Sequence, residues 1–390
     1  MFTRIIHSAH LVNDGVSQPD AWVGFEGATV GATGTGDSWR SRADAATESV
    51  DAGGDFLTPG FIDIHSHGAA RAAFDDGPAA IAQALAAHRH HGTTRSVISL
   101  ISASPERLVA NLATVAELTR NDPLIVGSHL EGPFIDHEFR GAHDPTIVRS
   151  PSPAEIDGLL AAADGTLRQI TLAPELPGGG DALARCVAAD VRVAVGHTAA
   201  TYAQTSAAFD AGASILTHAF NGMREIHHRA PGPVAAAFNA SHVTLEVIND
   251  GVHVHPDVVA MLFASAPDRV ALITDAMAAA CAGDGHYVLG SLDVSVTEGV
   301  ARLTEGNSIA GSTLTMDAAV RRAITEVGLS VPQAVAAATA VPARAMGRAG
   351  DLGSLAPGFA ADAVLLDADF RVRAVWAAGR ELPRPAHPDA

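Results

Sequence analysis

The middle of this 390-residue chain alternates between short apolar segments with the character of β-strands and longer segments with the character of α-helices. Eight segments rich in Val, Ile and Leu have strand character, and they cover residues 60–65, 94–100, 123–132, 168–175, 191–198, 213–220, 243–251 and 269–277. Helical segments stand between several of them, and Ser104 and Ser152 are expected to cap two of these helices. Eight strand–helix units predict an α/β fold, a (β/α)8 TIM-like barrel.

The two ends of the chain differ in character from the middle. Residues 1–56 contain short alternating stretches separated by Gly, Asp and Ser, which predicts antiparallel strands joined by tight turns. Residues 355–390 have the same character. We therefore expect a small β-sandwich module formed by both termini, residues 1–56 plus 355–390, and a hydrolase barrel of residues 57–354.

Charge and lysine content exclude several classes of function. The 43 acidic residues outnumber the 25 basic ones, so the net charge is −18, which argues against a nucleic-acid partner or an anionic membrane. The chain contains no lysine, which excludes a Schiff-base lysine, a P-loop lysine and a carbamylated lysine that bridges two metals. No run of about 18 uncharged apolar residues indicates a membrane span.

Cysteine usage and the N-terminal residues indicate the compartment. Cys186 and Cys281 are far apart in the sequence and make no disulfide framework, as is usual in a reducing cytoplasm. The first residues alternate like paired strands and lack the long apolar core of a signal peptide. We therefore expect a cytoplasmic protein.

Metal-ligating side chains stand at the ends of the expected strands. His65 and His67 end the first strand, and because residues two apart in a strand point to the same side, both imidazoles face one point. Similar residues end four further strands, namely His129, Glu131, His197, His218 and Asp275. Barrel enzymes keep their chemistry at this end of the strands. Each of these histidines alone would be a hydrogen-bonded core residue, but the ordered set predicts a site for Zn²⁺ or Fe²⁺.

A set of motifs in the same region is similar to those of a known family. They lie between residues 57 and 320 and read LTPGFIDIHSHG, GSHLEGPFI, RGAHDP, VGHTAAT, THAFNGM, RAPG, NDGVHVHP, ITDAM and AGSTLTMDAAV. The sequence resembles the amidohydrolase superfamily and, within it, the N-acetylglucosamine-6-phosphate deacetylase family. A lone HxH is a weak signal, whereas the ordered set is specific. The resemblance implies metal-dependent hydrolysis of the acetamide of N-acetylglucosamine 6-phosphate to glucosamine 6-phosphate and acetate, in amino-sugar catabolism or cell-wall recycling.

The resemblance implies which residues hold metal. Glu131, His197 and His218 correspond to the ligands of one ion. Some relatives lack the HxH pair and bind that ion alone, but this chain keeps His65 and His67, so a second ion, shared through Glu131 and touching Asp275, is an open alternative. We expect one or two divalent ions per chain, with Zn²⁺ as the expected ion and Fe²⁺ able to take the same ligands.

The resemblance also implies the catalytic groups. Asp275 is expected to orient the attacking water, take its proton and return the proton to the departing amine. The alternative is that Asp275 is a simple metal ligand, and both roles are compatible. His143 corresponds to the residue that polarises the acetyl carbonyl, the alternative being an ordinary loop histidine.

Four further residues are implied to bind the phosphorylated amino sugar. Arg229 corresponds to the phosphate arginine of the family, and a guanidinium fork suits phosphate oxygens. Asn221 and Gly222 correspond to donors to the same group, and His253 to a residue that contacts the sugar. In the family, Arg229 and His253 lie near a subunit interface, which implies a homodimer with the active site near that interface.

Three other functions stay open at this point. The same chemistry could act on the galactosamine epimer, because the sequence does not report the orientation of one hydroxyl. A catalytically silent sugar-phosphate-binding protein on the same barrel would lack a ligand or the base, and none is missing here. A hydrolase of cyclic amides is disfavoured by the absent bridging lysine and by the matched Arg229.

Overall fold

The computed structural model describes residues 2–383, and eight strands from the middle of the chain form one of its two eight-stranded sheets. The sheet has the order β15-β14-β13-β12-β11-β10-β9-β6, and the pairings from β9 to β15 are parallel. Its strands are β6 (Phe61–Ser66), β9 (Thr93–Ile101), β10 (Ile125–Glu131), β11 (Leu167–Leu172), β12 (Arg192–Val195), β13 (Ile215–Leu216), β14 (Thr244–Ile248) and β15 (Val270–Ile273). Each of the eight strands overlaps one of the eight segments expected from the sequence.

The first and last strands of this sheet meet at their C-terminal ends. The Asp275 amide donates to the His65 carbonyl at 2.8 Å. The amides of His67 and Gly68 both donate to the Ala276 carbonyl, at 2.7 and 3.0 Å. These bonds complete the ring where the expected ligands stand, and the barrel predicted from the sequence is confirmed.

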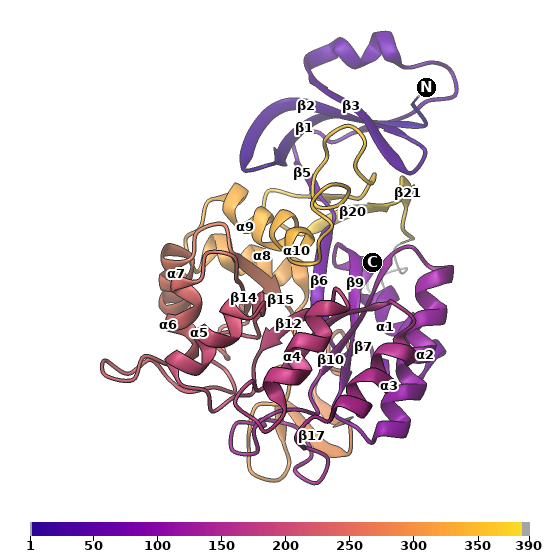
Figure 1. Cartoon of the computed structure of the whole chain (residues 1–390). Helices are drawn as coiled ribbons and strands as arrows, with labels where there is room; N and C mark the ends of the chain where they lie inside the picture. The colour runs from indigo at the N-terminus through magenta and orange to yellow at the C-terminus, as the bar shows by residue number, and fades with distance from the viewer. Residues whose placement is uncertain (1, 384–390) are drawn as a thin grey trace. The chain divides into compact units, whose positions relative to one another are not determined.

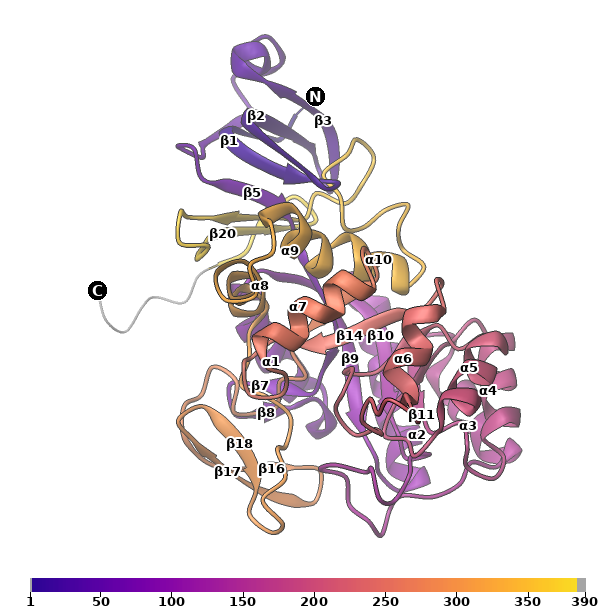
Figure 2. The ribbon, with the colours of Figure 1, turned by 90° about the vertical axis from the view of Figure 1, so that its left-hand side faces the viewer.

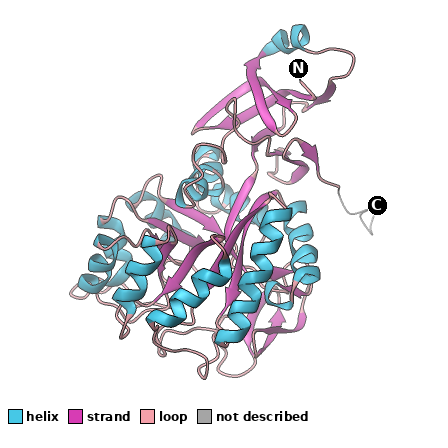
Figure 3. Ribbon diagram, turned by 45° about the vertical axis from the view of Figure 1, so that its right-hand side comes forward, coloured by secondary structure: helices cyan, strands magenta, loops and turns pink. Residues whose placement is uncertain are grey.

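Helices follow the strands and lie outside the ring (Figure 3). They are α1 (Pro78–His90), α2 (Pro105–Asn121), α3 (Pro153–Ala163), α4 (Gly179–Ala188), α5 (Tyr202–Asp210), α6 (Gly232–Asn239) and α7 (Pro256–Ser265). The Ser104 hydroxyl accepts from the Arg107 amide, and that of Ser152 accepts from the Glu155 amide. Both expected N-caps are confirmed, and in each case a proline follows at the first helical position, where its missing N–H costs nothing.

A second sheet joins both ends of the chain (Figure 1). Its order is β21-β20-β19-β5-β1-β2-β3, with β4 paired to β1. The strands are β1 (Arg4–Asn13), β2 (Val16–Glu26), β3 (Thr29–Thr35), β4 (Glu48–Asp51), β5 (Phe56–Pro59), β19 (Ala363–Leu366), β20 (Val372–Ala377) and β21 (Arg380–Glu381). Antiparallel pairing of β5 with β19 links the two termini, and Phe25, Leu57 and Trp376 are buried in its core. The expected module of both termini is therefore one continuous sheet.

By compactness the chain divides into two units. One comprises Met1–Asp63, Ala86–Arg95 and Met316–Ala390, and the other Ile64–Leu85 and Ser96–Thr315. The boundary between the two units falls within β6 and within β9. The domain limits expected from the sequence therefore stay a prediction. Residues 384–390 of the expected terminal module lie outside the described part of the chain. The first unit also contains η1 (Gly36–Arg42), α8 (Met316–Thr325), α9 (Val331–Ala338) and α10 (Ala340–Ala345).

The second unit carries a small antiparallel sheet of its own, which is seen apart from the parallel strands in Figure 2. It consists of β16 (Gly285–Leu289), β17 (Leu292–Thr297) and β18 (Val300–Leu303), inserted after the last barrel strand. Short pieces η2 (Phe74–Asp76), β7 (Gly68–Ala69) and β8 (Ala72–Ala73) follow the first barrel strand. No helix within residues 2–383 is both long and apolar enough to cross a membrane.

Candidate active site

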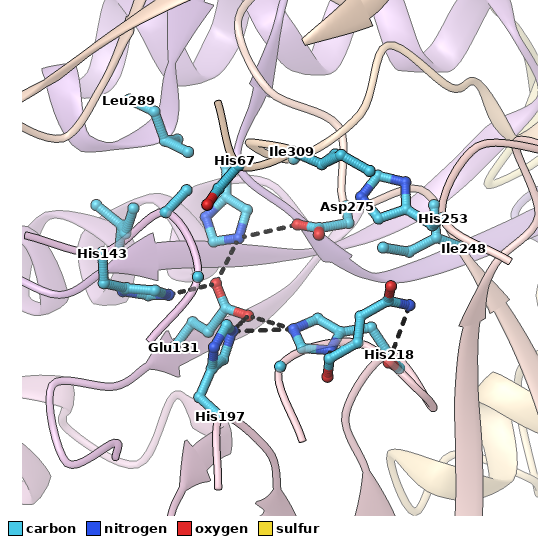
Figure 4. A pocket seen from close by; sticks show the side chains of 17 residues that line it. His67, Glu131, His143, His197, His218, Ile248, His253, Asp275, Leu289 and Ile309 are labelled. Carbon is cyan, nitrogen blue, oxygen red and sulfur yellow. Dashed lines mark hydrogen bonds and ion pairs between the residues drawn. The ribbon is translucent and has the colours of Figure 1, made fainter. Parts of the chain in front are cut away.

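Glu131, the last residue of β10, stands at the centre of the strand-end cluster (Figure 4). Its carboxylate is buried, and both oxygens face histidines. Oε1 lies 3.2 Å from Nε2 of His197, 3.1 Å from Nε2 of His218 and 3.3 Å from Nε2 of His65. Oε2 lies 3.1 Å from Nε2 of His67 and 3.4 Å from Nε2 of His143. One carboxylate therefore touches ligand candidates from four other parts of the barrel rim.

The protonation pattern of His197 and His218 points to a cation. Nδ1 of His197 lies 2.8 Å from the Phe139 carbonyl, and Nδ1 of His218 lies 3.2 Å from the Asn221 carbonyl. A carbonyl only accepts, so each Nδ1 carries the proton and a neutral ring leaves Nε2 bare. The two Nε2 atoms are 3.0 Å apart. In the neutral tautomer these two atoms and Glu131 Oε1 are three electron-pair donors that face one another, an arrangement that would suit a divalent cation.

A second group of donors lies beside the first. His65, His67, Glu131 and Asp275 each present one ligand atom, and these four atoms lie within 4.8 Å of one another. Nε2 of His65 is 3.2 Å from Nε2 of His67, and Asp275 Oδ1 is 3.6 and 3.4 Å from the two nitrogens. This donor set also fits a divalent cation, with Glu131 shared between the two groups.

The charges of this second group are strongly coupled. Burial lowers the pKa of His67, but hydrogen bonds to the Asp275 and Glu131 carboxylates outweigh burial and raise the pKa to about 9. Burial likewise opposes ionisation of Asp275, yet the nearby His65 and His67 hold its pKa below the usual range. In the metal-free cluster, protons on the imidazoles therefore balance the negative charge of the carboxylates. A cation would displace those protons on binding.

Glu246 is a functional residue that the sequence analysis missed. It lies in β14, is fully buried, and its Oε2 is 3.1 Å from Nδ1 of His65. The same oxygen accepts the backbone amide of His218 at 3.3 Å, and Oε1 accepts Nε2 of Gln169 at 2.8 Å. A carboxylate behind a metal-ligating histidine fixes the ring and its tautomer. The available signal was a single acid inside the apolar strand TLEVI, because a buried charge needs partners.

His129 is the one strand-end histidine that stays out of both ligand groups. Its Nδ1 lies 2.9 Å from the Ser99 hydroxyl and its Nε2 2.9 Å from the Thr171 hydroxyl. Burial holds its pKa well below the ordinary value, so the ring is neutral. It is a hydrogen-bonded core histidine beneath the site.

His143 lies on the opposite side of Glu131 from Asp275 (Figure 4). Its Nδ1 is 2.8 Å from the Ser102 hydroxyl, a residue that the sequence analysis did not single out. Burial lowers the pKa of His143 to about 4 against the raising effect of Glu131, so its imidazole is neutral at neutral pH. A neutral ring can hold its proton on the nitrogen that faces the cavity and act there as a donor.

The backbone at three ligand positions is unusual. His197, His218 and Asp275 have φ of 47°, 23° and 48°, in the left-handed region that residues other than glycine seldom adopt. Gly222 packs against His197 so closely that an added Cβ would lie 2.9 Å from its Nδ1. Such strain persists only where the surroundings enforce it, as is typical of functional sites.

A cavity of about 270 Å³ opens over these groups. Towards His143 it is lined by Ile101, Ala142 and Leu289. Elsewhere its wall includes Asn221, Gly222, Ile248, His253, Ser308, Ile309 and Gly311.

The expected substrate-binding residues divide between the cavity and the surface. Asn221, Gly222 and His253 line the cavity, and Nδ1 of His253 lies 2.7 Å from Asp250 Oδ2. Arg229 does not line it; this arginine is exposed, and its Nη1 lies 2.7 Å from Nε2 of His228. The cavity wall of the described chain therefore contains no arginine.

Comparisons with known proteins agree with this geometry. Residues 56–382 match the amidohydrolase family. The chain is 40% identical over 330 residues to the N-acetylgalactosamine-6-phosphate deacetylase of Escherichia coli O157:H7, covering 84% of this chain and 87% of that protein. It is 34% identical over 382 residues to the N-acetylglucosamine-6-phosphate deacetylase of Vibrio furnissii, covering 97% and 93%.

Solved structures extend the comparison to the fold. A mutant of the N-acetyl-D-glucosamine-6-phosphate deacetylase of Mycobacterium smegmatis, in complex with N-acetyl-D-glucosamine-6-phosphate, superposes with a TM-score of 0.92 at 41% identity. The match covers 97% of this chain and 99% of that one. The N-acetylglucosamine-6-phosphate deacetylase of Pasteurella multocida also superposes with a TM-score of 0.92, at 26% identity, covering 97% and 99%.

Proposed function

This chain belongs to the amidohydrolase family, and from that premise we propose that it hydrolyses the acetamide of N-acetylglucosamine 6-phosphate, releasing glucosamine 6-phosphate and acetate. The observation that carries the proposal is the convergence of Glu131, His197 and His218 on one point, with Asp275 and His143 on two sides of it. A buried group of imidazole and carboxylate ligands could hold a divalent cation, and a carboxylate base lies beside it. This combination suits hydrolysis of an unreactive amide.

Two groups of residues would hold divalent metal. Glu131, His197 and His218 would hold one ion, and His65, His67, Glu131 and Asp275 a second. When bound, such an ion supplies Lewis acidity to a carbonyl and lowers the pKa of water. We propose Zn²⁺ at both, since imidazole and carboxylate are its common ligands, with Fe²⁺ as the alternative that elemental analysis would identify.

Asp275 is proposed as the base and acid of the reaction. Hydrolysis joins the water oxygen to the carbonyl carbon and breaks the C–N bond, and the amine must leave with a proton. Asp275 stands at the edge of the ligand cluster, with Oδ1 3.4 Å from Nε2 of His67, and lines the cavity, so its carboxylate is placed to accept that proton from water. Asp275 then delivers the proton to the nitrogen, which avoids an amide anion as leaving group.

His143 is proposed to polarise the acetyl carbonyl. If the Ser102 hydroxyl donates to Nδ1, the proton of the neutral ring is on Nε2, which faces the cavity. Nε2–H then donates to the oxygen on which negative charge develops. The Ser102 hydroxyl has two acceptors within reach, Nδ1 of His143 and the Glu131 carbonyl at 3.3 Å, and the tautomer that the reaction requires is the one in which its proton goes to Nδ1.

The sugar phosphate would occupy the remaining part of the cavity. Asn221, Gly222 and His253 line that part and offer side-chain or backbone donors. Because no arginine among residues 2–383 lines the wall and Arg229 is exposed, we propose a homodimer in which Arg229 of a second copy completes the phosphate site. A phosphorylated substrate and two free cysteines also favour the cytoplasm as the place of reaction.

The experiment measures release of acetate and free amine by the purified protein with N-acetylglucosamine 6-phosphate. Wild type is expected to turn the substrate over, and Asp275→Asn is expected to lose at least about 10²-fold in kcat. Wild-type protein that binds the sugar phosphate without turnover would be a silent binding protein. Full activity in Asp275→Asn would overturn the assigned base.

The galactosamine epimer is the second candidate substrate. It is favoured by the 40% identity to a relative named N-acetylgalactosamine-6-phosphate deacetylase. Competition of both epimers in one reaction gives the ratio of their specificity constants directly, and a ratio above one for the galactosamine epimer would replace the substrate proposed above.

A further inference from the structure

We propose that the hairpin tip between β16 and β17 sets the size of the acyl group that the enzyme removes. Leu289, with Ile101 and Ala142, forms the wall against which the acyl chain ends. The inference rests on the proposed deacetylation and adds to it the determinant of acyl length. None of these three side chains carries a polar group, so they would select the acyl group by its size and shape.

The polar groups of the site determine which way the amide lies. Asp275 serves the departing nitrogen, and His143 serves the carbonyl oxygen from the other side of Glu131 (Figure 4). The nitrogen carries the sugar, so the sugar extends towards Asp275 and His253. The acyl carbon chain is the third substituent of the planar carbonyl carbon, so it points away from both the nitrogen and the oxygen. The apolar part of the cavity wall that lies away from the sugar is formed by Ile101, Ala142 and Leu289.

An apolar cluster lies at the His143 end. Ala142 precedes His143 in the chain, and Ile101 precedes Ser102, whose hydroxyl is 2.8 Å from Nδ1 of His143. Leu289 packs in the same buried cluster as both, and all three line the cavity. Their exposed fractions are only 4% for Ile101, 8% for Ala142 and 6% for Leu289, so an acyl chain that reaches them meets a closed wall.

The hairpin tip is anchored to the loop that carries His143. The Ser291 hydroxyl donates to Asp144 Oδ2 at 2.6 Å, and Asp144 directly follows His143. Leu289 pairs with Leu292 across the two-residue turn, in which Gly290 has a φ of 63°. A Cβ at Gly290 would lie 3.4 Å from Ile101, so the tip already touches the barrel. The position of Leu289 relative to His143 is therefore held by a hydrogen bond and by packing.

A wall held in this way discriminates by length. An acetyl group presents one methyl to it, and each further methylene must displace Leu289 or Ile101 from a packed cluster. One methylene in an apolar pocket changes the specificity constant by about 10-fold to about 200-fold. We therefore expect wild type to prefer acetyl over propionyl and butyryl groups on the same sugar phosphate.

The test compares kcat/KM for N-acetyl, N-propionyl and N-butyryl glucosamine 6-phosphate. Leu289→Ala should raise the butyryl-to-acetyl ratio by about 10-fold or more, and Leu289→Phe should lower it. Val288→Ala is the matched control, because Val288 is the preceding residue of the same strand and is 51% exposed. Ile309→Ala enlarges another part of the cavity wall and should leave the ratio unchanged, whatever it does to the overall rate.

The butyryl-to-acetyl ratio of kcat/KM does not depend on the fraction of enzyme that is folded, so it reports the acyl wall alone. Activity of wild type on the acetyl substrate reports the proposed function. If wild type fails to hydrolyse the acetyl substrate, the proposed function falls and this inference falls with it. If wild type hydrolyses it but neither Leu289→Ala nor Leu289→Phe moves the ratio, only the acyl wall is overturned. An equal rise in Ile309→Ala would also overturn it, because the effect would not be local to the hairpin.

Discussion

Nδ1 of His65 lies 3.1 Å from Oε2 of Glu246, the oxygen that also accepts the backbone amide of His218. Glu246 thus contacts one residue from each of the two groups of metal-ligand candidates. The His65 ring has its Nε2 directed at the cluster because its Nδ1 is held on the other side. A fully buried carboxylate at the seventh barrel strand therefore holds residues of both groups of ligand candidates at once.

Glu246→Gln should weaken metal retention more than it weakens the fold. The amide keeps the volume but loses the charge that orients His65, and such partners are worth about 10-fold to about 100-fold in metal affinity. Competition with a chelator, followed by elemental analysis, measures the loss without relying on turnover. The matched control is Gln169→Met, which removes the donor to Oε1 and leaves Oε2 with its partners, so a loss of metal as large as in Glu246→Gln would contradict the assignment.

His67→Gln should reduce the metal content of the purified protein by one ion per chain. The change removes a donor of the group with His65 and Asp275 and leaves Glu131, His197 and His218 complete. Elemental analysis of protein prepared without added metal gives the stoichiometry. The converse variant His197→Gln should lose the other ion, and an unchanged count in His67→Gln would mean that the HxH group holds no metal.

His143→Gln should lower kcat by about 10²-fold to about 10³-fold, the usual effect of removing one donor to a developing oxyanion. Metal content should stay at the wild-type value, because His143 is proposed as a donor to substrate. Steady-state kinetics and elemental analysis of the same preparation check both points. A loss of metal parallel to the loss of rate would make His143 a ligand, in line with its 3.4 Å distance to Glu131.

Arg229→Ala and Asp275→Asn should complement each other if Arg229 serves the neighbouring subunit. A mixed dimer would contain one site with an intact Asp275 that is completed by the intact Arg229 of the other chain. Co-expression of two tagged variants and purification of the mixed dimer should therefore restore about half of the wild-type rate per dimer, by site counting. No recovery would place Arg229 in the site of its own chain or outside any site.

Asp250→Asn should move the pH dependence of KM to lower pH. Burial lowers the pKa of His253, but the hydrogen bond and charge of Asp250 outweigh burial and raise it. The protonated ring is the better partner for a sugar phosphate, so KM should rise as the pH passes the His253 pKa from below. Without the Asp250 charge that pKa falls, and the rise should begin earlier. KM profiles that coincide for wild type and variant would show that His253 takes no part in binding the sugar phosphate.

The alternation of strands and helices, the helix caps at Ser104 and Ser152, and the grouping of strand-end ligands could all be predicted from the sequence. The reason is topological. In a parallel barrel every strand ends at the same rim, so His65, Glu131 and His218 converge although about 150 positions separate the first from the last. No distance had to be known for that conclusion.

Tertiary structure alone decided which partner each side chain meets. His129 and Glu131 stand two positions apart on β10, yet the first is held by Ser99 and Thr171, and the second joins both ligand groups. The carbonyls of Phe139 and Asn221 set the tautomers of His197 and His218, and the course of the loops places these carbonyls beside the two rings. Leu289 reaches the cavity through a hairpin inserted after the last strand. Such contacts depend on loop course and register to within an ångström, and local periodicity carries no information about either.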